Sequence, residues 1–328
     1  MVEILVYCGQ RDSKLFKSSF DLLGGVQDIA SKSNCLVSAV LIGGEAVESC
    51  VDELGFYGAH KVYICKDAAL EQYNPEKYLH ALDAVCRIAE PHLMVFVSDT
   101  TGRELAPRLA YKRQAGIVTD CITLELTGDD NSLVIQKPVY GGKAIAEIQA
   151  QPVQVVTVRQ RCFEPIEKDN SKKAEEVVVE LDMPETLERI KLLEFIEEKA
   201  EGIKLEEAGI IVSGGRGIGG KEGFDELGKL ADLLSGAVGS SRAPVDSGWI
   251  PPSFQIGLTG TIVAPDLYFA IGISGASQHL AGMSGSKCIV AINKDPDASI
   301  FKAAQFGIVE DYKKVLPETI KQVRKIFT

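Results

Sequence analysis

Residues 267–279 read LYFAIGISGASQH, and this stretch decides the fold of the chain around it. The run LYFAI is continuously apolar, which is typical of a strand buried on both faces of a parallel sheet. Glycines, serines and a histidine follow it, and the apolar spacing of Leu280 and Met283 fits a helix. We therefore predict a strand, a turn and a helix, with Ser274 and Gly275 at the start of the helix. Such a loop lies at the carboxyl end of a strand, where open α/β sheets bind their ligands.

The sequence on both sides of this stretch repeats the alternation of strand and helix. Apolar segments predict strands at 209–213, 236–239, 267–272, 287–292 and 306–309. Apolar residues at helical spacing predict helices at 224–235 and from Leu316 to Phe327. These elements predict an α/β domain over residues 208–328 that is built on a doubly wound parallel sheet.

The first half of the chain alternates in the same way. It predicts strands at 2–7, 35–42, 61–65 and 92–97, and helices at 14–31, 45–56, 76–89 and 101–114. Because these strands are almost continuously apolar, helices should cover both faces of a parallel sheet. Shorter β-rich segments follow at 118–126, 132–137, 143–149 and 153–158. We predict that these are antiparallel strands, added to the sheet or folded over its edge.

A charge-rich stretch at 161–208 separates the two halves. The apolar run from Val177 to Leu181 predicts a strand within it, and the remaining charges are interpreted as a solvated face. We expect an N-terminal α/β domain at 1–190 that acts as scaffold and partner interface, a linker or connecting helix at 191–207, and the second α/β domain at 208–328. Two domains agree with a length of 328 residues.

Composition narrows the class of protein. The formal net charge of −11 argues against general binding to nucleic acid or to a membrane surface. There is no apolar run of about 18 residues to span a membrane. The segment from Met1 to Cys8 lacks the basic start of a signal peptide, which predicts a cytoplasmic protein, or a mitochondrial-matrix protein if a presequence is removed. The eight cysteines form no CxxC pair, so we expect no metal site, and no arrangement of residues indicates a catalytic centre.

The loop after the strand at 209–213 is rich in glycine. Its glycines fit the GxGxxG pattern of a dinucleotide-binding turn at positions 215, 217 and 220. Arg216 within the pattern and Lys221 to Gly223 after it, which should delay the helix, argue against the usual nicotinamide version. Arg242 at the end of the next strand could meet a 2′-phosphate, so an NADP-dependent oxidoreductase is one alternative. A glycine-rich loop without a ligand is another, and a non-catalytic nucleotide-binding module suits the N-terminal domain better.

Polar residues also follow the next two segments. Ser241 and Arg242 suit a phosphate or an electron-rich ring, although Arg242 could instead form a surface ion pair with Asp246. Thr259 lies between glycines that would allow the backbone to approach a planar ligand, and its hydroxyl could donate a hydrogen bond to that ligand. The alternative for Thr259 is a plain turn.

The strand ends further along the domain offer contacts of three kinds. Free N–H groups at the start of the helix after residue 272 would attract an anion such as a pyrophosphate. His279 lies about one turn into that helix, on the side that can reach a ligand. Asn293 and Lys294 could contact a nucleotide or form a turn, and the Glu310-Asp311 pair could accept ribose hydroxyls.

Residues 267–283 and 289–293 closely resemble the signature of the electron transfer flavoprotein alpha (large) subunit family. Further blocks resemble the same family in the same order: Ser213 to Gly217, Ser241 to Asp246, and Ala291 to Pro296. The likeness is strong over 209–312 and looser over 1–160, where Asp99 to Arg108 carries it.

The resemblance implies an electron carrier rather than a stand-alone enzyme. It implies an FAD-binding C-terminal domain and a heterodimer with a smaller beta subunit. It also implies electron transfer from dehydrogenases, often the acyl-CoA dehydrogenases of fatty acid beta-oxidation, to a quinone oxidoreductase or ferredoxin. Both a simple electron relay and electron bifurcation are compatible with it.

The same resemblance implies roles for residues at matching positions. Arg216, Ser241, Ser274 and Gly275 would hold the pyrophosphate region, with Arg242 and Thr259 near the flavin N5, His279 near the flavin O2, and Asn293 and Asp311 towards the adenosine end. The remaining expected FAD contacts are Gln255, Gly257, Gly260, Gly272, Ser277, Gln278 and Lys294. Arg242, Thr259 and His279 would tune the flavin by stabilising negative charge on its ring. Leu258 departs from the glutamine of many relatives, which puts the contact there in doubt.

Overall fold

The protein is described by a computed structural model over residues 2–33, 35–127, 132–142, 144–150, 153–184, 187, 189–194 and 203–327. It divides into two compact units. The first comprises Met1–Pro138 and Ile145–Ile196, and the second comprises Val139–Ala144 and Glu197–Thr328. The short segment Val139–Ala144, with η3 (Tyr140–Gly142), was expected in the N-terminal domain but is grouped with the second unit.

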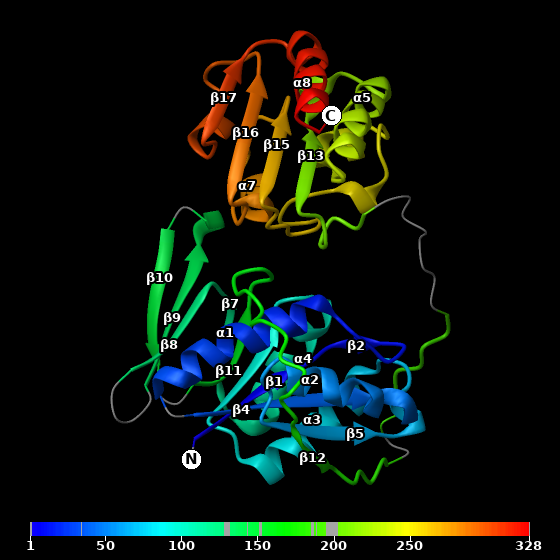
Figure 1. The fold of residues 1–328 in the computed structure, drawn as a ribbon, viewed down its shortest axis with the longest axis vertical. Helices are drawn as coiled ribbons and strands as arrows, with labels where there is room; N and C mark the ends of the chain where they lie inside the picture. The colour runs from blue at the N-terminus through cyan, green and yellow to red at the C-terminus, as the bar shows by residue number, and fades with distance from the viewer. Residues whose placement is uncertain are drawn as a thin grey trace. The chain divides into compact units, whose positions relative to one another are not determined.

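The first unit is built on a seven-stranded sheet in the order β12-β5-β4-β1-β6-β11-β7 (Figure 1). Its strand pairs are parallel. The strands are β1 (Glu3–Tyr7), β4 (Leu36–Gly43), β5 (Lys61–Lys66), β6 (Leu93–Val97), β7 (Gly116–Cys121), β11 (Val153–Val158) and β12 (Glu175–Val178). The helices are α1 (Lys17–Ser33), η1 (Glu45–Cys50), α2 (Val51–Phe56), η2 (Ala68–Leu70), α3 (Pro75–Ala89) and α4 (Thr100–Arg113).

Side-chain alternation along β1 divides the core of this unit into two layers. Ile4 and Val6 pack with α1 and α2 on one face, whereas Leu5 and Tyr7 pack with α3 and α4 on the other. Successive residues of a strand point to opposite faces, so a continuously apolar strand supplies both layers. The predicted parallel sheet with helices on both faces is confirmed.

The β-rich segments after α4 separate into two groups. β8 (Thr123–Thr127), β9 (Ser132–Val139) and β10 (Ala144–Ala150) form a small sheet in which β8 and β9 are antiparallel, as predicted. The prediction is wrong for β7 and β11, which join the parallel sheet. The reason is burial, because Val155, Val156 and Val158 of β11 are all buried, as in a central parallel strand.

Local details also differ from the prediction at the start of the first unit. The helix expected at 14–31 begins at Lys17, because β2 (Gln10–Arg11) and β3 (Lys14–Leu15) form a short hairpin. Asp12 and Ser13 turn this hairpin with positive φ angles of 50° and 55°. The segment 45–56 is a six-residue 3₁₀-helix, η1, followed by α2.

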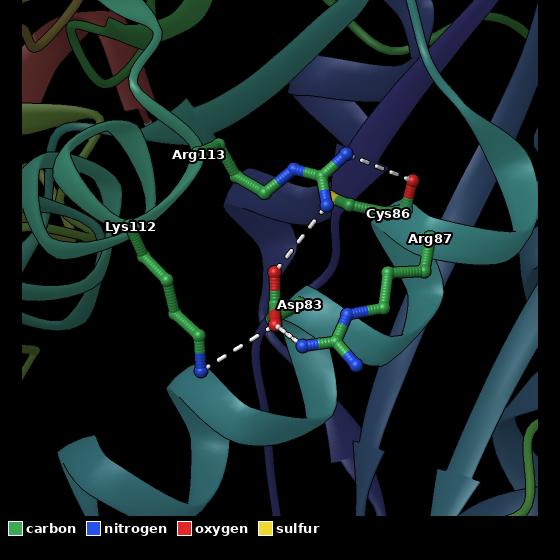
Figure 2. A network of polar contacts seen from close by, with 5 residues as sticks. All are labelled: Asp83, Cys86, Arg87, Lys112 and Arg113. Carbon is green, nitrogen blue, oxygen red and sulfur yellow. Dashed lines mark hydrogen bonds and ion pairs between the residues drawn. The ribbon is translucent and has the colours of Figure 1, made fainter.

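Helices α3 and α4 are joined by a buried carboxylate surrounded by cations (Figure 2). The Asp83 side chain is only 5% exposed, and its Oδ2 lies 2.8 Å from Arg87 Nη2 and 3.4 Å from Lys112 Nζ. Its Oδ1 lies 3.5 Å from Arg113 Nη1, and Arg113 Nη2 contacts the Cys86 carbonyl at 3.5 Å. The cations lie near the C-terminal ends of both helices, where positive charge is favourable.

The second unit has a five-stranded sheet in the order β14-β13-β15-β16-β17, with parallel pairs throughout. Its strands are β13 (Ile210–Gly214), β14 (Ala237–Ser240), β15 (Leu267–Ile271), β16 (Cys288–Asn293) and β17 (Phe306–Val309). Its helices are η5 (Arg216–Ile218), α5 (Lys221–Leu233), α6 (Arg242–Asp246), η6 (Pro252–Phe254), α7 (Ser277–Met283), η7 (Ser299–Lys302) and α8 (Tyr312–Phe327).

Both faces of this second sheet are covered. α5 and α8 lie side by side and supply Phe224, Leu227 and Leu316 to one layer (Figure 1). The other layer contains Met283 of α7, Ile256 and Ile300. The predicted doubly wound parallel sheet is confirmed.

Two expectations for the C-terminal half need correction. α5 begins at Lys221, directly after the last glycine of the loop, so residues 221–223 do not delay the helix. The connecting helix expected at 191–207 is absent from residues 191–194 and 203–207, and residues 195–202 lie outside the described residues. Among the described residues, no helix is long and apolar enough to cross a membrane.

Candidate functional site

The strand order of the second unit creates a switch point between β13 and β15. From β13 the chain moves outward to β14 on one side, and from β15 it moves to β16 and β17 on the other. Loops that leave neighbouring strands in opposite directions open a crevice at the carboxyl end of the sheet. The GISGASQH stretch and the glycine-rich loop therefore lie at the position where this fold binds ligands.

These two loops contact one another through their backbones. Gly215 N–H donates to the Ile271 carbonyl at 2.9 Å, and Gly217 N–H donates to the Gly272 carbonyl at 3.0 Å. A Cβ on Gly215 would lie 2.2 Å from the Gly272 oxygen, and Gly272 itself has a φ of +62°. Part of the glycine content therefore serves loop packing and not a ligand.

Glycines at the start of α5 serve a different purpose. A Cβ added to Gly219 or Gly220 would meet nothing within 4 Å. Gly220 is also the cap residue of α5, and it provides no side-chain hydrogen bond to the first turn of that helix. This end of α5 is open to a ligand, with free backbone N–H groups of the kind that bind phosphates.

The helices after β14 and β15 begin in the same way. Ser241 precedes α6 and Ala276 precedes α7, and neither side chain caps its helix. Direct backbone bonds hold these segments together at the carboxyl edge: Ser241 N–H donates to Gly214 O at 3.0 Å, and Ile256 N–H donates to Ser240 O at 2.8 Å. Three helices that follow strands of this sheet therefore begin at its carboxyl edge without a side-chain cap.

Two arginines add positive charge to this edge. Arg216 is exposed in η5, and Arg242 is exposed at the start of α6. Arg242 Nε contacts Asp246 Oδ2 at 3.2 Å, so the surface ion pair considered from the sequence is present. Because both side chains are more than half exposed, this pair contributes little stability. The guanidinium can therefore bind an anion at small cost.

The 255–261 loop, which runs from Gln255 to Thr261, presents polar groups near α7. Gln255 Nε2 donates to Thr259 Oγ1 at 3.0 Å, which leaves the Thr259 O–H free to donate to a ligand. Gly257 has a φ of +148°, and a Cβ on Gly260 would lie 2.3 Å from the Gln255 oxygen. Leu258 is 62% exposed, so the residue that departs from the family pattern is at the surface.

The GISGASQH loop is shaped by close packing against η7. Gly275 has a φ of +83°, and a Cβ there would lie 2.2 Å from the backbone nitrogen of Ile300. The Ser274 carbonyl accepts from Ile300 N–H at 3.1 Å, and the Ser274 side chain is exposed. The Ser277 hydroxyl donates to Gln278 Oε1 at 3.3 Å.

His279 does not point to the solvent. Its side chain is 5% exposed, its Nδ1 lies 3.0 Å from the Ile256 carbonyl, and its Nε2 lies 3.0 Å from the Tyr268 hydroxyl. Burial lowers the pKa of His279 to about 4. Both ring nitrogens have protein partners in this arrangement, so the expected contact with the flavin O2 stays a prediction.

The residues expected at the adenosine end are already used within the loops that hold them. Asn293 Nδ2 donates to the Ile273 carbonyl at 2.9 Å, and its Oδ1 accepts from Asp295 N–H at 3.0 Å. Asp311 Oδ1 accepts from Lys313 N–H at 2.9 Å. Lys294 is exposed. The turn-forming role considered from the sequence is therefore present, and the adenosine contacts stay predictions.

Sequence reasoning missed Tyr268, which lies fully buried in β15 beside His279. The signal was available, since a tyrosine in a buried strand needs a hydrogen-bond partner for its hydroxyl. The run LYFAI is apolar apart from this hydroxyl, and its spacing alone assigns the hydroxyl no partner.

Two family models match this chain. The electron transfer flavoprotein domain matches residues 4–184, and the electron transfer flavoprotein FAD-binding domain matches residues 204–284. The second match includes the loops after β13, β14 and β15 and the whole 255–261 loop.

Three relatives are similar over nearly the full length of this chain. An electron transfer flavoprotein subunit alpha from Thermoanaerobacterium thermosaccharolyticum is 41% identical over 327 residues, 99% of this chain and 98% of that protein. An acryloyl-CoA reductase electron transfer subunit beta from Anaerotignum propionicum is 33% identical over 352 residues, 98% of this chain and 96% of that protein. A lactate dehydrogenase (NAD(+),ferredoxin) subunit from Acetobacterium woodii is 33% identical over 322 residues, 98% of this chain and 76% of that protein.

Proposed function

The chain belongs to the electron transfer flavoprotein family as an alpha subunit that binds FAD, and we propose that it holds FAD in the crevice at the carboxyl edge of the β13–β17 sheet. Three helix starts without side-chain caps support this location, because they lie along the carboxyl edge of the sheet and leave backbone N–H groups for a pyrophosphate. The open space beside Gly219 and Gly220 supports the same location.

The chemistry of the surrounding side chains fits FAD. Arg216 and Arg242 offer guanidinium groups to phosphate or to negative charge on a flavin ring, and Thr259 offers a hydroxyl. Bound FAD supplies the capacity to accept and release electrons. The residues of the chain hold it, orient it and place positive charge beside it. The family matches support this reading and not the NADP-dependent oxidoreductase.

Electron transfer flavoprotein alpha subunits pair with a beta subunit. We propose that the electron donor of this pair is an acyl-CoA dehydrogenase or a related dehydrogenase, and that the acceptor is a quinone oxidoreductase or ferredoxin. The names of two relatives support a dehydrogenase partner, since one serves an acryloyl-CoA reductase and the other a lactate dehydrogenase. We propose the cytoplasm as the compartment of the pair.

Co-expression with the beta subunit of the same organism tests this proposal. The pair should co-purify, show the visible absorption of a flavin, and release FAD on denaturation. A pair that stays colourless after incubation with excess FAD would contradict the proposal.

A matched pair of variants tests the location of FAD. Arg242→Ala should weaken FAD binding at least about tenfold, because it removes a charged hydrogen-bond donor from the crevice. Arg108→Ala is the control, since Arg108 also forms an exposed i,i+4 ion pair, with Glu104, but lies in the first unit. Equal FAD affinity in both variants would place the cofactor elsewhere.

A further inference from the structure

Three segments of the second unit meet at the His279 ring. Tyr268 comes from β15, His279 from α7 and Ile256 from the 255–261 loop. Both contacts of the ring are 3.0 Å long. Tyr268 is fully buried and His279 is nearly so, which means that water cannot replace either partner.

The partners assign the tautomer of His279. A backbone carbonyl only accepts hydrogen bonds, so the proton lies on Nδ1 and is donated to Ile256. In a neutral imidazole the other nitrogen is an acceptor, so Nε2 accepts the proton of the Tyr268 hydroxyl. The single N–H of the ring is therefore used within the protein.

The 255–261 loop depends on α7 for its position. Leu258 N–H donates to the Gln278 carbonyl at 2.8 Å, and Val263 N–H, just beyond the loop, donates to the Gly282 carbonyl at 2.7 Å. A Cβ on Gly282 would lie 2.4 Å from Gly257 Cα, so the two backbones are in direct contact. The His279–Ile256 hydrogen bond is the side-chain link in this series, and Tyr268 anchors it to the sheet.

We propose that Tyr268 is a positioning residue, which fixes the orientation and the tautomer of His279 so that His279 holds the 255–261 loop against α7 in its FAD-binding position. This inference rests on the proposed location of FAD, because Gln255 and Thr259 are the residues that the loop presents. His279 then links β15 to the loop, and the loop presents Thr259.

Nitrogen NMR of the complex, labelled with isotope in histidine, tests this link directly. The chain has four histidines, and His60, His80 and His92 all belong to the first unit. We expect His279 to be the Nδ1–H tautomer at pH 7. In Tyr268→Phe, which deletes the donor to Nε2, its ring nitrogen shifts should change. An Nε2–H tautomer or a charged ring in the wild type would overturn the inference without any variant.

FAD affinity of the alpha–beta complex tests the consequence. Tyr268→Phe should weaken FAD binding about fivefold, the usual effect of one lost hydrogen bond. Tyr78→Phe is the control, since the Tyr78 hydroxyl is also buried and bonded, to the Leu70 carbonyl at 3.1 Å, but lies in the first unit. Wild-type FAD affinity in Tyr268→Phe would overturn this inference alone, whereas a wild-type complex that binds no FAD would contradict the proposed function.

Two substitutions of His279 separate its two bonds. The amide nitrogen of His279→Asn can replace Nδ1 as the donor to Ile256, whereas the amide of His279→Gln extends towards Tyr268. We therefore expect His279→Asn to retain more FAD affinity than His279→Gln. The reverse order would show that the link to the loop is not the function of His279.

Discussion

The two units of this chain share one architecture and differ at the edge where their strands end. Each has a parallel sheet with helices on both faces. In the first unit, the helices after β5 and β6 begin with aspartates: Asp67 accepts from Ala69 N–H at 2.7 Å, and Asp99 accepts from Gly102 N–H at 2.7 Å. In the second unit, α5, α6 and α7 begin at Gly220, Ser241 and Ala276, without a side-chain cap.

This difference agrees with the proposed location of FAD in the second unit. A carboxylate at a helix start satisfies the free N–H groups and repels a phosphate from the same place. A glycine leaves these N–H groups free to donate hydrogen bonds to an anion. Binding of the anion then stabilises the folded state of the unit.

The buried polar groups of the two units differ in charge as well. The first unit buries the acidic side chain of Asp83 among Arg87, Lys112 and Arg113 (Figure 2). The second buries the uncharged pair of Tyr268 and His279. A charge cluster is tolerated where its cations reach solvent, but beside a cofactor it would change the field that the cofactor experiences.

The largest expected change in stability distinguishes a glycine that is needed for packing, Gly275, from one that faces the proposed ligand, Gly220. Gly275→Ala should destabilise the second unit by about 4 kcal/mol, because a strained backbone and an overpacked contact with Ile300 add together. FAD binding should be lost with it. Gly220→Ala is the control, which should leave the urea unfolding midpoint almost unchanged, since its methyl group meets no protein atom. A wild-type midpoint for Gly275→Ala would contradict this division.

Protonation of His279 makes the stability of the second unit depend on pH. Burial lowers the pKa of His279 to about 4, so between that value and its ordinary 6.5 the folded state binds fewer protons than the unfolded state. The stability from the neutral ring is complete above pH 6.5 and is lost as the pH falls to about 4. The total loss is about 3 kcal/mol. Urea unfolding from pH 7 to 4 should show this slope in the wild type and not in His279→Asn.

Removing the buried charge of the first unit should have a smaller effect. Asp83→Asn should destabilise that unit by about 2 kcal/mol, because it removes the acceptor that three cations share. FAD affinity should not change. Asp28→Asn is the control, since the exposed pair of Asp28 and Lys32 contributes less than about 0.5 kcal/mol. Weaker FAD binding in Asp83→Asn would contradict the separation of the two units.

The smallest change in stability is expected when the cap residue of α5 is replaced by an aspartate, as at the start of α4. Gly220→Asp gives α5 the kind of cap that α4 has in Asp99, and should change the stability of the second unit by less than about 0.5 kcal/mol. Its carboxylate should nevertheless weaken FAD binding strongly, as measured by flavin titration, because it occupies the expected phosphate position. Unchanged FAD affinity would show that the pyrophosphate does not bind at the start of α5.

The sequence by itself determined the elements of both sheets and the edge that carries the site. Period and composition are local, so the apolar run at 267–271 and the glycines after it predicted β15 and its loop directly. The glycine-rich loop, Ser241, Arg242 and the 255–261 loop were predicted at this edge for the same reason, and the structure brings them together there.

Only the tertiary structure decided which partners each group takes. The positions of β7 and β11 in the parallel sheet depend on what covers them, and no local pattern records that. The same holds for His279: its sequence neighbours predict a ligand contact, which stays a prediction, but they do not indicate that Tyr268 from β15 and Ile256 from the 255–261 loop lie beside its ring nitrogens. A hydrogen bond between residues distant in sequence exists only after the sheet, helix and loop have packed together.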